Sequence, residues 1–178
     1  FIGFNISFVF KNKKKDIGIL DAFVLTLLCW TILTLIGSIP FYIGSTNLSF
    51  IDAFFESMSG ITTTGATVIR DIDNTAESIL IWRAMLQWLG GIGIIVIAIA
   101  VFPVLKLGGM QLFKTEFSAR DDKVLPRTTT IAAGIGLVYL SLTLLCFVFL
   151  VMAGMDMFNG IAHAMTIVAT GGFSTKNM

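Results

Sequence analysis

Ser59-Gly60-Ile61-Thr62-Thr63-Thr64-Gly65-Ala66-Thr67 is the stretch that decides the fold of this chain, because it is polar and lies among long apolar segments. Its side chains are small, most of them carry a hydroxyl group, and glycine interrupts it at two positions. Irregular backbone at membrane depth is tolerated only where protein buries it or where it lines a water-filled cavity. The flanking sequence must show whether this stretch lines a cavity or is an ordinary polar loop.

The composition indicates a membrane protein. Of the 178 residues, 56% are hydrophobic and 13% are charged, and that charged share is about half the usual value for a soluble domain. A soluble fold of this length could not bury so much apolar surface, so we expect membrane lipid to surround the chain. The formal net charge of +1 gives no reason to expect a nucleic-acid partner.

Three segments contain an uncharged apolar run long enough to cross a bilayer, which takes about 20 residues. We predict spanning helices over 19–43, 76–105 and 129–153. Two further apolar segments, 51–61 and 158–168, are too short to cross at a rise of about 1.5 Å per residue.

A strand rich in threonine and glycine follows each short segment, at 62–67 and at 169–174. A helix lying on the membrane surface needs no such strand after it, whereas a re-entrant half-helix needs a compact strand through which the chain returns to the outside. The prediction is therefore an all-α polytopic membrane protein with two re-entrant segments.

Basic residues set the predicted orientation. Lysines crowd the polar segment 11–16, and five Lys and Arg residues lie in the segment 106–127. Cytoplasmic loops of membrane proteins carry an excess of these residues. We therefore predict that both segments are cytoplasmic and that the threonine- and glycine-rich strands open to the outside.

The short segments and their strands form an internal repeat. An offset of 107 residues sets Gly65 against Gly172, Met58 against Met165 and Thr63 against Thr170. The order of spanning helix, outer turn, half-helix and strand is the same in both copies. Transporter folds are often built from internal repeats, and the second copy makes an ordinary polar loop a poor explanation of the first.

The chemistry of such strands suits a monovalent cation. A permeating ion loses its water, and rings of backbone carbonyl oxygens can replace that shell. Glycine adopts the required backbone conformations at little cost. Each half-helix runs inward, so its partially negative C-terminal end faces the cavity and favours a cation.

These segments resemble TrkH-type potassium uptake proteins of the Trk/Ktr/HKT superfamily. Ser57–Thr67 (SMSGITTTGAT) resembles the first filter of that family, and Ala169–Thr175 (ATGGFST) resembles its second. Trp88–Val96 (WLGGIGIIV) and Gly108–Leu112 (GGMQL) resemble the stretches that follow the first filter. The likeness runs from about residue 20 to the end of the chain.

The resemblance implies repeats of the potassium-channel-like type, each made of a helix M1, a re-entrant pore helix, a filter and a helix M2. The family has four repeats around one pore, so we expect this chain to be a fragment that lacks repeats three and four and the gating loop. The resemblance implies four segments. Residues 1–18 are the end of a preceding helix and a basic loop, and residues 106–128 are a cytoplasmic connector. The first repeat is 19–105, with M1 19–43, pore helix 51–61, filter 62–67 and M2 76–105. The incomplete second repeat is 129–178, with M1 129–153, pore helix 158–168 and filter 169–174.

The resemblance also implies site residues and partners. Potassium, as the transported ion, is expected to be coordinated by backbone carbonyls of the two filters, at Thr62, Thr63, Thr64, Gly65, Ala169, Thr170, Gly171 and Gly172. The second filter has Ala169 and Gly171 where the first has threonine, which argues against a fourfold-symmetric site. The family further implies a multi-pass protein of the cell (inner) membrane, a homodimer, and a cytosolic nucleotide-binding regulatory ring of the TrkA type.

Glu56 and His163 occupy matched half-helix positions, and an ionisable group at membrane depth is a functional candidate. We expect them to support the filter by hydrogen bonding behind it, with direct ion contact as the alternative. Asp52 is a candidate cap of its half-helix. Arg70 follows the filter closely and would repel a cation, so we expect it to pair with Asp71 or Asp73.

Three other functions remain to be distinguished from potassium uptake. The same architecture could carry another monovalent cation such as sodium, or the chain could be a non-conducting membrane scaffold. A membrane enzyme would need a nucleophile and base or a set of metal ligands, and His163 is the sole histidine, so we predict that the chain is not an enzyme. The residues leave open whether transport is channel-like or coupled to protons or sodium.

Overall fold

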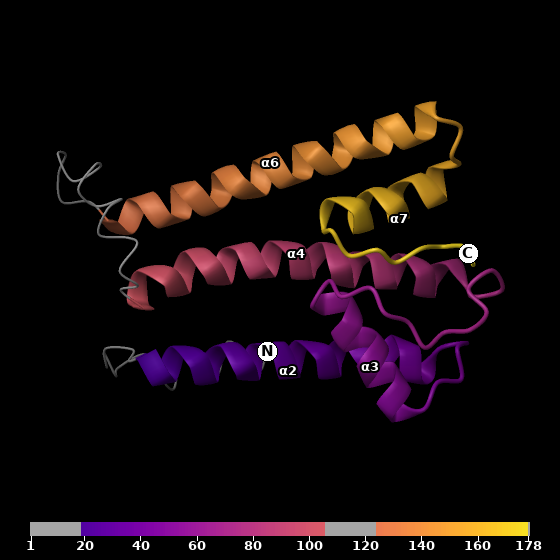
Figure 1. Cartoon of the computed structure of the whole chain (residues 1–178), viewed down its shortest axis with the longest axis horizontal. Helices are drawn as coiled ribbons and strands as arrows, with labels where there is room; N and C mark the ends of the chain where they lie inside the picture. Colours follow the sequence, from indigo (N-terminus) through magenta and orange to yellow (C-terminus); the bar gives the residue numbers. More distant parts are fainter. Residues whose placement is uncertain (1–18, 106–123, 178) are drawn as a thin grey trace.

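The computed structural model describes residues 19–105 and 124–177, and all regular elements within these ranges are α-helices. They are α2 (Ile19–Ile43), α3 (Phe50–Ile61), α4 (Glu77–Leu105), α6 (Val124–Met152) and α7 (Met157–Val168). Three long helices lie side by side, and the short helices α3 and α7 lie at one end of the bundle, each followed by an extended strand (Figure 1). This arrangement confirms the all-α fold class with two half-helices.

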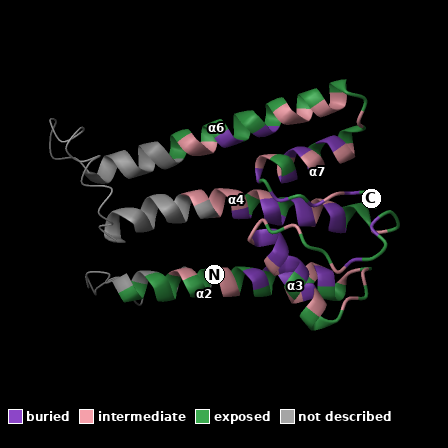
Figure 2. Ribbon diagram, in the orientation of Figure 1, coloured by how far each residue is buried: buried purple, intermediate pink, exposed green. Residues whose placement is uncertain are grey.

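The long helices expose apolar side chains. The segments Phe23–Ile43 and Ala133–Met152 are long and apolar enough to cross a membrane. Leu28, Phe149 and many of their neighbours are at least half exposed. Buried residues instead concentrate around α3, the facing part of α4 and the two strands (Figure 2). The core of this region therefore lies where the half-helices meet α4, and the outer faces of α2 and α6 suit a lipid environment.

Helix α4 contacts each of the four other described helices. Glycine permits two of its close approaches, since a Cβ atom on Gly90 would lie 1.9 Å from the carbonyl oxygen of Ile61, and one on Gly91 would lie 2.6 Å from the hydroxyl of Tyr139. The Tyr139 hydroxyl also donates to the carbonyl of Trp88 at 3.1 Å. These contacts seat α4 between α3 and α6 and bring it behind both strands.

The two half-helices begin with the same cap. Ser49 precedes α3, and its hydroxyl accepts the N–H of Asp52 at 3.2 Å. Asp156 precedes α7, and its carboxylate accepts the N–H of Asn159 at 3.1 Å. Hydrogen bonds from the Asn159 side chain and backbone lower the pKa of Asp156. The prediction that Asp52 caps α3 is therefore wrong: Asp52 is the third helical residue, and its carboxylate accepts a hydrogen bond from the hydroxyl of the actual cap, Ser49, at 2.7 Å.

Both half-helices also end in the same way. The N–H of Thr64 donates to the carbonyl of Ser59 at 2.9 Å, and the N–H of Gly171 donates to that of Thr166 at 2.8 Å. The N–H groups of Thr63 and Thr170 each donate to the carbonyl three residues earlier, so each helix ends in a Schellman motif. The residue in the left-handed conformation is threonine in each, with φ of 56° at Thr63 and 54° at Thr170, where glycine is usual.

The 107-residue offset therefore describes backbone geometry as well as sequence. Helix α3 and helix α7 each have 12 residues, and their first residues, Phe50 and Met157, are 107 apart. Gly65 has φ of 81° and Gly172 has φ of 82°. The two copies thus follow the same path through the cap, the half-helix, its C-terminal turn and the start of the strand, although few of their side chains are identical.

The start of α6 differs from the predicted boundary between the connector and the second repeat. Helix α6 begins at Val124, five residues before the predicted start at 129, so the predicted connector 106–128 extends into its first turns. Pro126 lies in the first turn of α6, where proline is tolerated because its missing N–H has no helical partner. The predictions for 1–18 and for the connector residues 106–123 lie outside the described residues.

Candidate functional site

The first predicted filter leaves the end of α3 as an extended strand. Thr62 is the C-cap of the helix, and its hydroxyl donates to the carbonyl of Met58 at 2.7 Å. The hydroxyls of Thr62 and Thr64 lie 2.8 Å apart. Ser59, on the last turn of α3, donates to the carbonyl of Ala66 at 2.5 Å. The threonine side chains therefore bond locally to the helix end and to each other.

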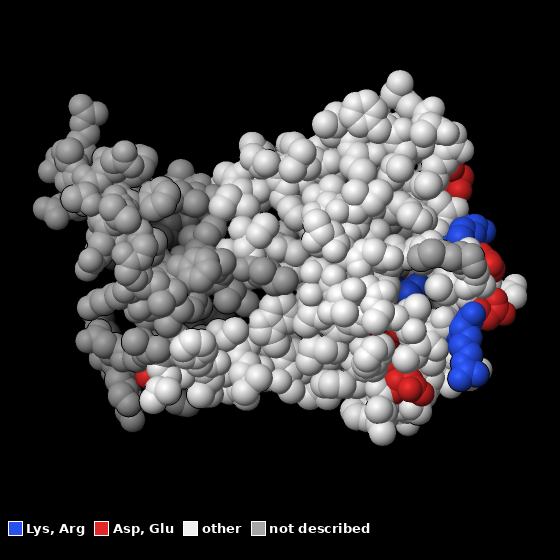
Figure 3. Space-filling model, in the orientation of Figure 1, with Lys and Arg blue, Asp and Glu red and all other residues white. Residues whose placement is uncertain are grey.

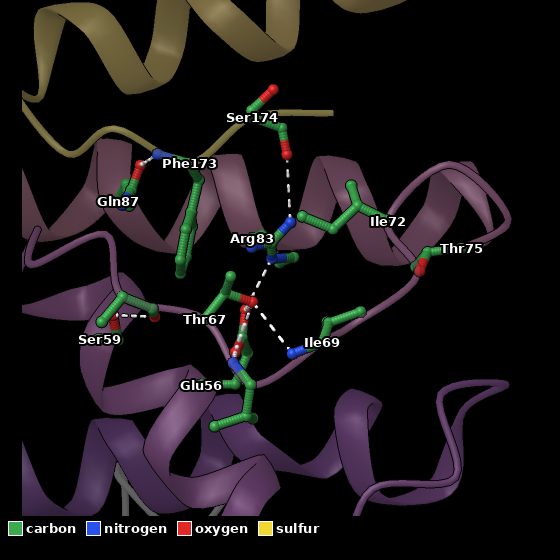
Figure 4. Close-up of polar contacts among 12 residues, drawn as sticks. Glu56, Ser59, Thr67, Ile69, Ile72, Thr75, Arg83, Gln87, Phe173 and Ser174 are labelled. Atoms are coloured by element: carbon green, nitrogen blue, oxygen red, sulfur yellow. Dashed lines mark hydrogen bonds and ion pairs between the residues drawn. The ribbon is translucent and has the colours of Figure 1, made fainter. Parts of the chain in front are cut away.

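Glu56 holds the next part of this strand from behind. Its side chain is fully buried and accepts hydrogen bonds from the Thr67 hydroxyl at 2.9 Å and from the Val68 N–H at 2.9 Å (Figure 4). It also accepts a hydrogen bond from Nε of Arg83 at 2.8 Å. In the structure Glu56 thus contacts the strand that follows Gly65 and a helix of the same repeat.

The ring of His163, at the matched position of the second half-helix, has its hydrogen bond within its own helix and none to a described residue of the strand. Its Nδ1 atom lies 2.8 Å from the carbonyl of Asn159 on the same helix. The second strand is instead bonded to α7 through Asn159, whose side-chain oxygen accepts from the Thr175 hydroxyl at 2.5 Å. Equivalent sequence positions therefore have different contacts in the two copies, because the anchor of the second strand lies one helical turn earlier.

The two strands lie against each other. A Cβ atom on Gly65 would lie 2.0 Å from the carbonyl oxygen of Gly171, so only glycine allows this approach. A hollow of about 240 Å³ lies between the strands and is bordered by residues that include Gly65, Gly172 and Ser174. The eight predicted filter residues are thus brought together as two adjoining strands.

Oxygen atoms are the available ligands in this region. The described residues contain no cluster of three or more His, Cys, Asp or Glu that could hold a metal ion. The C-terminal ends of α3 and α7 both lead into the strands, and a helix C-terminus carries partial negative charge. Backbone carbonyls held beside two such ends suit a dehydrated cation better than an anion.

Most of the charged side chains on the visible face gather at the end where the strands and turns lie, while the flanks are uncharged (Figure 3). Arg70 is exposed at this end, and the Glu56–Arg83 pair is the one ion pair among residues 19–105 and 124–177. The prediction that Arg70 pairs with Asp71 or Asp73 is therefore wrong.

A second arginine, Arg83, lies near the start of the apolar helix α4 and is buried. Arg83 is only 1% exposed and is bonded to Glu56. Gln87, one turn further along α4, is fully buried and accepts the N–H of Phe173 at 3.2 Å. Two polar residues four positions apart in an otherwise apolar helix were the signal that could have identified this pair.

The chain is similar to known proteins of cation transport. The family model TrkH, described as a cation transport protein, matches residues 2–177. The chain is 45% identical over 170 residues to the Trk system potassium uptake protein TrkH of Vibrio parahaemolyticus, covering 94% of this chain and 35% of that protein. It is 39% identical over 173 residues to the Trk system potassium uptake protein TrkG of Escherichia coli K12, covering 94% of this chain and 36% of that protein.

A solved structure is also similar to this chain, both in fold and in sequence. The crystal structure of the potassium transporter TrkH from Vibrio parahaemolyticus matches with a TM-score of 0.75 and 42% sequence identity, covering 93% of this chain and 32% of that one. The chain thus spans about a third of the length of the relatives that it matches.

Proposed function

Because the chain belongs to the TrkH family of cation transport proteins, we propose that it forms the first pore repeat and part of the second in a potassium uptake protein of the cell (inner) membrane. The observation that carries the proposal is the repeated backbone path, with positive φ at Thr63 and Gly65 and at Thr170 and Gly172. In this proposal the first repeat is 19–105, and the second begins with α6 and continues through residue 178.

The proposed ion ligands are backbone carbonyls of two filter strands. They belong to Thr62, Thr63, Thr64 and Gly65 in the first and to Ala169, Thr170, Gly171 and Gly172 in the second. Alternation between left-handed and extended backbone is one way in which consecutive carbonyls can be aimed toward one axis. A threonine with positive φ costs about 1–2 kcal/mol, and strain of this kind clusters at functional sites. Its presence at matched positions supports a functional reason for the path.

Potassium ions would enter from the outside, exchange water for carbonyl oxygens and pass inward. The negative ends of α3 and α7 lower the cost of holding a dehydrated cation between the strands. Glu56 acts in this proposal as filter support, since its contacts are with Thr67 and Val68 on the strand. His163 is a weaker candidate for the same role because its ring bonds to its own helix.

The remaining parts of the proposal come from the family relationship. The segments 11–16 and 106–127 would be cytoplasmic, the intact protein would form a homodimer, and a TrkA-type nucleotide-binding ring would regulate it from the cytosol. The matched family is a transport family and not an enzyme class, and the proposed function requires no catalytic residue.

Uptake of rubidium, a potassium tracer, tests the proposal. The intact transporter containing this chain would be expressed in cells that lack other potassium uptake systems. External potassium should inhibit rubidium uptake at much lower concentrations than external sodium does. Equal inhibition by the two ions would favour a general monovalent cation transporter, and absence of uptake with normal membrane insertion would favour a scaffold.

A further inference from the structure

Two polar residues of the first repeat reach across to the strand of the second. Arg83 and Gln87 lie one turn apart on the same face of α4, and both are buried. Nη1 of Arg83 donates to the carbonyl of Ser174 at 3.2 Å, and Gln87 accepts the N–H of Phe173 at 3.2 Å (Figure 4). Adjacent residues of the second strand are thus bonded to a helix of the first repeat.

Packing fixes the same part of the second strand. The guanidinium carbon of Arg83 lies 4.1 Å from the centre of the Phe173 ring, within the range of a cation–π contact. A Cβ atom on Gly171 would lie 2.3 Å from the amide carbon of Gln87, so the Gln87 side chain closes against the strand backbone. Any sliding of this strand would break these contacts together.

The same arginine is bonded to the support of the first strand. Its Nε donates to Glu56 at 2.8 Å, and Glu56 in turn accepts from Thr67 and Val68. A continuous path of hydrogen bonds therefore runs from the first strand through Glu56 and Arg83 to Ser174 on the second.

Stability alone is a poor reason for this arrangement. Buried ion pairs can often be replaced by packed apolar residues without loss of stability, because their desolvation cost is large. In addition, Nη2 of Arg83 and Nε2 of Gln87 have no hydrogen-bond acceptor among the described residues, and a buried donor without an acceptor costs about 1–3 kcal/mol. Burial of these charged and polar groups therefore lowers the stability of the fold, and a role in positioning the strands would explain why they are present.

On the basis of the proposed function, we infer that Arg83 and Gln87 are positioning residues that set the distance between the two filter strands. The second half-helix does not position this part of the strand by itself. His163 bonds to its own helix, and the hydrogen bond of Asn159 to the strand is made at Thr175. Ion discrimination by the first two filters thus depends on side chains of α4 that touch no ion.

The ion pair can be tested by removing one or both charges. Arg83→Met leaves Glu56 buried without its partner, and we expect little protein to reach the membrane. The double variant Glu56→Gln with Arg83→Met removes both charges, so it should restore the amount of protein but not the preference for potassium over sodium. Potassium preference equal to wild type in the double variant would overturn the inference.

The acceptor on Gln87 allows a sharper comparison at constant volume. Gln87→Glu keeps an oxygen that accepts the Phe173 N–H, whereas Gln87→Met removes it. At matched membrane amounts, Gln87→Met should lower the preference for potassium over sodium by about tenfold, and Gln87→Glu should retain it. Thr143→Val is the matched control, because Thr143 is buried and its hydroxyl bonds to Trp88 on α4 and to Tyr139 on its own helix, with no hydrogen bond to the described residues of either strand.

Hydrogen exchange at the Phe173 amide separates this inference from the proposed function. Exchange should be faster in Gln87→Met than in wild type and unchanged in Gln87→Glu and Thr143→Val, whichever ion the protein carries. A wild-type protein with no preference for potassium but with this exchange pattern would refute potassium uptake and leave the positioning role intact. Equal discrimination and equal exchange in the two Gln87 variants would refute the positioning role.

Discussion

Replacing Gly65 with alanine should disrupt the contact between the two strands more than any other change of one methyl group near them. The added Cβ atom would lie 2.0 Å from the carbonyl oxygen of Gly171. Carbon and oxygen atoms in close backbone contacts are usually about 3.3 Å apart or more, so the strands would have to separate by about 1.3 Å. The positive φ of 81° at Gly65 adds about 1–2 kcal/mol of backbone strain.

A separation of this size is more than twice the tolerance of about 0.5 Å within which a binding constellation must be held. We therefore expect Gly65→Ala to reduce potassium-sensitive rubidium uptake by about tenfold or more per transporter in the membrane, since each 1.4 kcal/mol changes an equilibrium constant tenfold. The assay is initial uptake in cells that lack other potassium transporters, with the membrane amount measured on the same samples.

Gly154→Ala separates backbone strain from the steric effect. Gly154 has φ of 98°, and a Cβ atom there would meet nothing within 4 Å among the described residues. This variant should therefore incur the cost of positive φ in an outer turn without moving the strands, and its uptake per transporter should stay near wild type. The reasoning is wrong if Gly65→Ala retains wild-type uptake, or if Gly154→Ala loses as much as Gly65→Ala does.

Three further predictions concern stability and can be followed by thermal unfolding of the purified intact protein. Gly90→Ala should destabilise it by about 1–3 kcal/mol through overpacking. Gly93→Ala, whose Cβ would meet no described residue within 4 Å, should be neutral or stabilising, and equal effects would contradict the packing role of Gly90. Ser49→Ala should cost about 1 kcal/mol because it removes a helix N-cap, and Ser49→Asp should not. The lowered pKa of Asp156 means that its carboxylate stabilises the fold above the unfolded pKa of about 3.9 and loses this effect as pH falls through the lower folded value. Asp156→Asn should therefore weaken this acid dependence while keeping a cap, and an unchanged dependence would refute the assignment.

Much of the fold was accessible from the sequence because membrane helices leave strong signals. Long uncharged runs marked the spanning helices, and segments too short to cross marked the half-helices. Three identities, Gly65 with Gly172, Met58 with Met165 and Thr63 with Thr170, together with the matched order of elements, placed the two copies at an offset of 107 residues. The backbone then shows the same offset at Gly65 and Gly172, because positive φ at these positions makes glycine a constraint in both copies.

Side-chain contacts were less accessible. Arg83 reads as an interfacial residue because it lies near the end of an apolar helix, and its partner Glu56 is 27 positions away. The alignment of Glu56 with His163 correctly matched backbone positions, yet it carried no information on which helix packs behind each strand. Ser49 and Asp52 are both of residue types that cap helices, and the sequence leaves the first residue of α3 uncertain by one turn, so it does not single out Ser49 as the cap.

The strand contact between Gly65 and Gly171 has a consequence for how such a protein can evolve. Both strands are encoded in one gene but at separate codons, so a mutation alters one strand and leaves the other as it was. In an assembly of identical subunits, the same mutation would change every strand at once and multiply its effect. The 107-residue repeat therefore lets selection adjust one strand in small steps while the facing strand keeps its geometry.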